Sequence, residues 1–138
     1  PSIPVKVTGD SPSYFRRHSS LLEGDGVKWV AGSGVEGATS IALTLSATEP
    51  EAPRPYTVRL HFTEPDPVVP GERVFNVAVQ GKPVAEALDI AQESKGRATA
   101  IVRELRGVRA GKTLTVTLTP KAGRTVLSGI EVLLEEGE

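Results

Sequence analysis

The sequence contains no cysteine. This absence excludes a disulfide framework, thiolate catalysis and zinc sites with cysteine ligands. It does not indicate the cellular compartment, because many exported folds lack disulfides. With 138 residues, the chain is long enough to bury about two thirds of the surface that its unfolded form exposes, so it needs no covalent or metal staple.

Long apolar runs and an excess of one charge are also missing. The longest apolar runs are far shorter than the ~20 residues that span a bilayer. Sixteen basic and seventeen acidic residues give a net charge of -1, and the basic residues are scattered. Proteins that bind nucleic acids or anionic membranes need a clustered basic surface. We therefore expect neither nucleic-acid binding nor membrane insertion.

Sequence motifs of catalysis and of metal binding are absent as well. There is no nucleophile elbow, P-loop or HExxH sequence. His18 and His61 lack the close spacing of metal ligands, and His61 is expected on the outward face of a strand. The sequence predicts no catalytic residue, no cofactor and no metal site.

Alternation of apolar and polar residues is the main positive signal. A period of two is typical of half-buried antiparallel strands. The alternating runs begin with Ile3, Val5 and Val7, and they recur at residues 41–45, 56–62, 75–79, 114–118 and 127–134. Fourteen Gly and eleven Pro suit many turns between short strands. The pattern predicts an all-β fold with two packed antiparallel sheets, a β-sandwich or jelly roll.

Turns and loops are predicted from composition. Residues 80–83 (QGKP), 109–112 (RAGK) and 120–124 (PKAGR) are expected to be hairpin turns. Residues 84–94 (VAEALDIAQES) are expected to form a strand followed by a loop. The chain opens at Pro1 without a leader-like segment, which indicates a fragment of something longer. Neither an internal repeat nor a linker is seen, so residues 1–138 are predicted to form one domain.

Two short motifs resemble functional signatures but are better explained as loops. Residues 32–37 (GSGVEG) match the glycine spacing of dinucleotide-binding proteins, yet a strand-like pattern follows where a helix is required. Glu64 and Asp66 would lie ~6.5 Å apart on an extended chain, which is compatible with a glycosidase carboxylate pair. Three nearby prolines favour a turn with solvated acids instead.

Two aromatic positions are candidates for sugar contact. Trp29 is the single tryptophan, and its ring could stack on a pyranose. Tyr14 lies in a segment that mixes aromatic, cationic and hydroxyl groups, YFRRHSS at residues 14–20. The alternative for both is burial at the core, which is the more frequent fate of such residues.

The central and C-terminal parts resemble a known family. Residues 56–90 (YTVRLHFTEPDPVVPGERVFNVAVQGKPVAEALDI) and 102–132 (VRELRGVRAGKTLTVTLTPKAGRTVLSGIEV) are similar to malectin-like carbohydrate-binding domains. Residues 29–45 resemble the segment that precedes this core in bacterial versions, which are modules of larger exported proteins. The resemblance implies a β-sandwich of malectin-like, galactose-binding-like type that lies outside the cell, in the periplasm or at the cell surface.

The same resemblance implies a non-catalytic module whose loops at one end hold an oligosaccharide or polysaccharide, with glucose among the candidate sugars. The family site uses loop aromatics and an aspartate. This chain has Pro65, Asp66 and Pro67 where the aromatic pair is expected, and Gly123 and Arg124 where the aspartate is expected. By position, Tyr14 or Trp29 would serve as the platform. The hydroxyl partners would come from Asp66, Arg73 and Arg124.

Three hypotheses remain open at this stage. The first is a sugar-binding module. The second is a structural or protein-interaction sandwich that has lost the sugar site and contacts other domains of its parent. The third is hydrolysis by Glu64 and Asp66, which would require a cleft and a raised carboxylate pKa.

Overall fold

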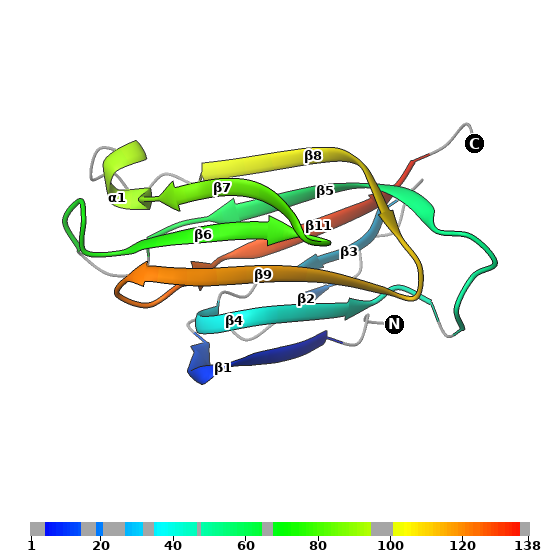
Figure 1. Ribbon diagram of the computed structural model, residues 1–138, viewed down its shortest axis with the longest axis horizontal. Helices are drawn as coiled ribbons and strands as arrows, with labels where there is room; N and C mark the ends of the chain where they lie inside the picture. Colours follow the sequence, from blue (N-terminus) through cyan, green and yellow to red (C-terminus); the bar gives the residue numbers. More distant parts are fainter. Residues whose placement is uncertain are drawn as a thin grey trace.

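The computed structural model is a sandwich of two antiparallel sheets (Figure 1). It describes residues 5–14, 19–20, 27–31, 35–46, 48–64, 68–94 and 101–135, and only the backbone within 10–14, 19–20 and 27–31. The sandwich predicted from the alternation is therefore confirmed. Ile3 lies outside the described residues.

The first sheet has six strands in the order β1-β4-β9-β6-β7, with β10 also paired to β4. Its strands are β1 (Val5–Tyr14), β4 (Val35–Thr44), β6 (Val74–Val79), β7 (Lys82–Leu88), β9 (Thr113–Ala122) and β10 (Val126–Leu127). The second sheet has five strands in the order β2-β3-β11-β5-β8. Its strands are β2 (Ser19–Ser20), β3 (Val27–Ala31), β5 (Arg54–Phe62), β8 (Ile101–Ala110) and β11 (Gly129–Leu134).

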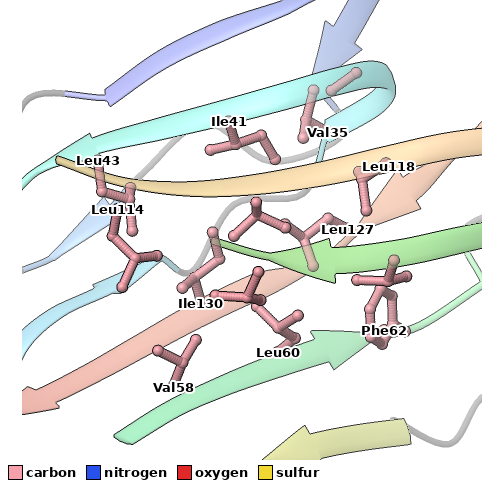
Figure 2. Packing of buried hydrophobic residues seen from close by; sticks show 14 of the residues in the cluster. Val35, Ile41, Leu43, Val58, Leu60, Phe62, Leu114, Leu118, Leu127 and Ile130 are labelled. Atoms are coloured by element: carbon pink, nitrogen blue, oxygen red, sulfur yellow. The ribbon is translucent and has the colours of Figure 1, made fainter. Parts of the chain in front are cut away.

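The inward residues of both sheets form one core. On β5, the side chains of Tyr56, Val58, Leu60 and Phe62 are buried, while the residues between them are partly exposed. Figure 2 shows Leu43, Leu114 and Leu118 of the first sheet above Val58, Leu60 and Phe62 of the second. Because the side-chain period is two, each such strand buries one face and leaves the other to solvent.

Hairpin turns form at two of the three predicted places. Gln80 and Gly81 connect β6 to β7, and both have positive φ, as two-residue hairpin turns require. Residues 111–112 connect β8 to β9. The third prediction is wrong in part, because β10 does not pair back onto β9. After Gly123, the chain pairs with β4 instead, at Val35 and Glu36.

One strand was not predicted, and two further expectations need correction. Residues 101–110 lack clean alternation but form the edge strand β8. The glycine-rich segment 32–37 is not wholly a loop, since β4 begins at Val35. After β7, the expected loop contains one short helix, α1 (Ile90–Glu93), which is capped by the Asp89 side chain accepting from the N–H of Gln92.

Candidate functional site

The candidate site lies at one end of the sandwich, which we call the rim. Here β5 ends at Phe62, β6 begins at Val74, β9 ends at Ala122 and β4 begins at Val35. In Figure 1 the rim is the left side of the molecule, where α1 also lies. The described rim residues are 35–37, 63–64, 68–73 and 123–125. Loops at the end of such a sandwich vary without disturbing the core, which makes them the usual place for binding.

A buried arginine joins the segments of the rim. Arg73 is 5% exposed. Its Nε donates to both carboxylate oxygens of Glu64, at 2.9 and 3.0 Å, and its Nη2 donates to Oε2 of Glu36 at 2.6 Å. Its Nη1 donates to the backbone carbonyl of Arg124 at 2.7 Å. One guanidinium therefore ties together β4, the β5–β6 loop and the β9–β10 connection.

Burial and ion pairing shift the pKa of Arg73 in opposite directions. Desolvation lowers the pKa of its guanidinium, but the hydrogen bonds and charges of Glu36 and Glu64 outweigh it, so the pKa lies above the usual value. The Glu64 side chain is only 8% exposed and that of Glu36 is 20% exposed. Burying either carboxylate in its ionised form without a cationic partner would cost several kcal/mol of folding free energy. The cluster therefore holds the rim in one geometry.

Arg124 lies above this cluster and is exposed. Its Nη2 donates to the backbone carbonyl of Glu36 at 3.2 Å. Beside it, the N–H of Gly37 donates to the carbonyl of Thr125 at 2.8 Å, and the Thr125 hydroxyl donates to the carbonyl of Ala38. Gly37 has φ +89° and leaves its Cβ position to the Arg124 guanidinium. The glycine is therefore required for this placement of Arg124.

Replacing Gly37 by Ala is expected to displace the Arg124 guanidinium and to lower stability by about 2–3 kcal/mol, since a positive φ alone costs an L-residue about 1–2 kcal/mol. Gly81→Ala is the matched control, because Gly81 also has positive φ but no heavy atom within 4 Å of its Cβ position. Urea unfolding of both variants separates backbone strain from the steric term. Equal losses would contradict the proposed contact with Arg124.

The structure brings together some of the predicted site residues and not others. Arg73 and Arg124 meet at the rim. The backbone of Tyr14 pairs with Val35 and so belongs to the same end. Trp29 lies in the other sheet, where its backbone pairs with Val132 of β11. Val132 is farther from the rim than Gly129, the first residue of that strand. Asp66 lies outside the described residues, as does His18.

Glu64 and Asp66 were expected to be solvated acids in a turn, and for Glu64 this expectation is wrong. Glu64 forms its ion pair with Arg73 and is nearly buried. Glu36 was not predicted from the sequence, and neither were the ion pairs of Arg73. Glu36 and Arg73 are 37 positions apart, so no local spacing could reveal their contact.

His61 lies on the outward face of β5, as predicted. Its side chain is half-buried, and Nε2 lies 2.8 Å from Oε1 of Glu131 on the neighbouring strand β11. The same face carries Arg59, which pairs with Glu104 at 2.6 Å. Such cross-strand pairs stabilise a sheet face modestly. We assign this network to the solvated surface of the second sheet.

The described residues include neither a candidate metal-binding cluster nor a candidate membrane-spanning helix. Within those ranges, no three His, Asp or Glu side chains are grouped so as to hold a metal ion. Among the same residues, no helix combines the length and the apolar character needed to cross a membrane.

The geometry defines a class of protein, namely an antiparallel β-sandwich with an ion-paired loop rim at one end. A family model described as "Malectin domain" matches residues 50–127. The chain therefore belongs to the malectin-domain family. The matched residues include β5 to β10 and the Glu64–Arg73 pair.

A curated relative and several solved structures are similar to this chain. Receptor-like protein 4 of Arabidopsis thaliana is 42% identical over 85 residues, which are 59% of this chain and 14% of the relative. The ANXUR2 extracellular domain of the same plant has a TM-score of 0.60 at 14% identity, over 76% of this chain and 32% of that one. This chain thus spans only a small part of each relative.

An enzyme also shares the fold. A calcium-binding mutant of Bacteroides uniformis β-glucuronidase 2 has a TM-score of 0.63 at 16% identity, over 96% of this chain and 14% of that one. At this identity the likeness shows the fold alone. It assigns no activity to this chain.

Proposed function

We propose that this chain is a non-catalytic carbohydrate-binding module that receives an oligosaccharide at the rim. The observation that carries the proposal is the membership in the malectin-domain family, together with the fixed loop geometry around Arg73. A binding rim needs polar groups held in place before the ligand arrives, since preorganisation reduces the entropy lost on binding.

The two rim arginines have different roles in this proposal. Arg124 is exposed and offers donors to sugar hydroxyls, whereas Arg73 is buried and acts by positioning Arg124 through its carbonyl. Asp66 completes the proposed contact set, and Tyr14, whose backbone lies at the rim, is the proposed stacking platform in preference to Trp29, whose backbone pairs with Val132 away from that end. Glu64 is a partner of Arg73 in this scheme and takes no part in hydrolysis.

The setting of the module is part of the proposal. We infer that the chain is one domain, is not an enzyme, and works outside the cell, in the periplasm or at the cell surface as part of a larger exported protein. The shares of the relatives that it covers, 14% and 32%, support a module among other domains.

The sugar-binding proposal is tested by titration with glucose, galactose and mannose polymers, preceded by a glycan array and followed by Trp29 fluorescence and calorimetry. Arg124→Gln is expected to weaken binding about tenfold, since a hydrogen bond from a charged donor is worth at least that factor. Arg54→Gln removes the same charge from the opposite end of β5 and should bind like the parent. Binding unaffected by Arg124→Gln would remove this residue from the site.

A second candidate function is supported by the composition of the rim. The stretch 63–73 and the residues 123–125 contain no aromatic ring, and the described part exposes Val69 at 59%. Such a surface suits a protein partner or a neighbouring domain. A related fold is seen in the solved complex of the plant peptide RALF23 with FER and LLG2, at 15% identity and a TM-score of 0.61. Retention of no glycan across the array would favour this alternative.

A further inference from the structure

A concave feature lies away from the rim, at the edge between the two sheets. It is a cleft of about 130 Å³ between the β6–β7 turn and the edge strand β8. Strand β6 runs from Val74 at the rim to Val79 at the cleft, which separates the two by about 17 Å. The cleft is therefore distinct from the proposed sugar site and does not rest on it.

Three cationic residues line this cleft, namely Lys82 of β7 and Arg106 and Arg109 of β8. Arg106 donates from Nε to Glu104 at 3.0 Å. Within the part of the chain that the structure describes, Lys82 and Arg109 form no ion pair. Among the described residues, no carboxylate therefore pairs with these two cations at the margin of the cleft.

The nearby acids are already engaged. Glu104 is held between Arg59 and Arg106. Oε2 of Glu135 accepts from the N–H of Gly107 at 2.6 Å and from the hydroxyl of Thr57 at 2.9 Å. These two bonds hold the pKa of Glu135 below its usual value, and the charges of Arg106 and Arg109 act in the same direction. Glu135 thus interacts electrostatically with Arg106 and Arg109, but it forms no ion pair with Lys82.

The remaining wall of the cleft is mostly apolar, with the polar side chain of Gln80 donating from Nε2 to the carbonyl of Arg109 at 3.2 Å. Val79 and Val108 are buried, and Leu105 packs against the same core. Gly107 lies between Arg106 and Val108 with φ +68° and has open space at its Cβ position. An apolar floor with cations at the margin excludes water from one side of an ion pair, which strengthens it relative to an ion pair in bulk water.

We propose that this cleft binds an oxyanion group, a carboxylate, sulfate or phosphate, between Lys82, Arg106 and Arg109, with the rest of the ligand lying over Val79 and Leu105. The volume has room for several water molecules, and therefore for one such group, but not for a drug-sized ligand. Arginine supplies paired donors that match the two oxygens of such a group, and lysine adds a point charge.

The test is a titration of the 138-residue chain with acetate, sulfate and phosphate, each against chloride at matched ionic strength. Amide resonances of residues 80–82 and 105–109 are followed by two-dimensional NMR. We expect saturable shifts at these residues with at least one oxyanion, and the ion that binds tightest identifies the ligand class. No saturable shift with any of the three would overturn the proposal.

Two variants locate the effect. The double variant Lys82→Gln/Arg109→Gln is expected to weaken binding about a hundredfold, because each lost charged donor is worth about tenfold. Lys6→Gln, which removes an exposed charge from β1, should leave the affinity unchanged. Lys82 and Arg109 are both exposed, so the fold should tolerate their replacement, and the amide spectrum of the double variant checks this directly. An equal loss of affinity in the Lys6→Gln variant would show that the ion responds to overall charge, and it would contradict a specific site in the cleft.

Discussion

Replacing Arg73 by Met is expected to lower the free energy of unfolding by about 3–5 kcal/mol, the cost of leaving buried charge without its partner. Glu64 at 8% exposure and Glu36 at 20% would lose the guanidinium that neutralises both. The backbone carbonyl of Arg124 would also lose its donor. Urea denaturation followed by circular dichroism measures the loss. A midpoint of thermal unfolding lower by roughly 10 °C would accompany it.

The control for this prediction is another arginine ion pair. Arg103 pairs with Glu93 at 2.6 Å, but both side chains are about one third exposed or more. Arg103→Met should cost less than about 1 kcal/mol, as exposed ion pairs contribute little. Adding Glu36→Gln and Glu64→Gln to Arg73→Met should recover at least half of the loss, because the unpaired charges disappear. An Arg73→Met variant as stable as the Arg103 control would show that the cluster does not hold the rim.

The second large effect is expected from the aromatic pair beneath the rim. Phe62 ends β5 and Phe75 lies near the start of β6, and both are fully buried. Their ring centroids are 5.9 Å apart with an interplanar angle of 52°. Phe62→Ala removes this contact and leaves a cavity, so it should lower the free energy of unfolding by about 3–5 kcal/mol.

Val102→Ala is a suitable comparison, because Val102 pairs with His61 next to Phe62 but is 46% exposed. Its expected cost is within about 0.5 kcal/mol. Chemical denaturation of the two variants measures the loss of stability. Sugar titration of the same variants shows whether the packing beneath the rim affects binding. If Phe62→Ala and Val102→Ala were equally stable, Phe62 would not be part of a close-packed core.

These two predictions concern the same physical unit. Phe62 and Phe75 support the chain on either side of the β5–β6 loop, and Glu64 and Arg73 lie between them in sequence, at the two ends of that loop. The rim is thus held from below by packing and from within by ion pairs. A loop held in this way can offer Arg124 to a ligand at small entropic cost.

The alternation of residues determined the fold class and most of the strands. Leu114, Val116 and Leu118 had to face one side because a strand places every second residue on the same face. The turn at Gln80 and Gly81 followed from local chemistry. Helix α1 was missed because four residues give too short a window for helical periodicity, and β8 was missed because an edge strand carries charges on both faces.

Only the tertiary structure decided what Arg73 does. From the sequence alone, Arg73 was one of several charged loop residues and was predicted, with Asp66 and Arg124, to contact sugar hydroxyls. Folding places it beside Glu36 of β4, although β9 separates β4 from β6 in the first sheet, and Arg73 is buried there. The physical reason is one of range. Strand patterns depend on residues that are neighbours in the chain, whereas an ion pair at the rim depends on where distant strands end in space.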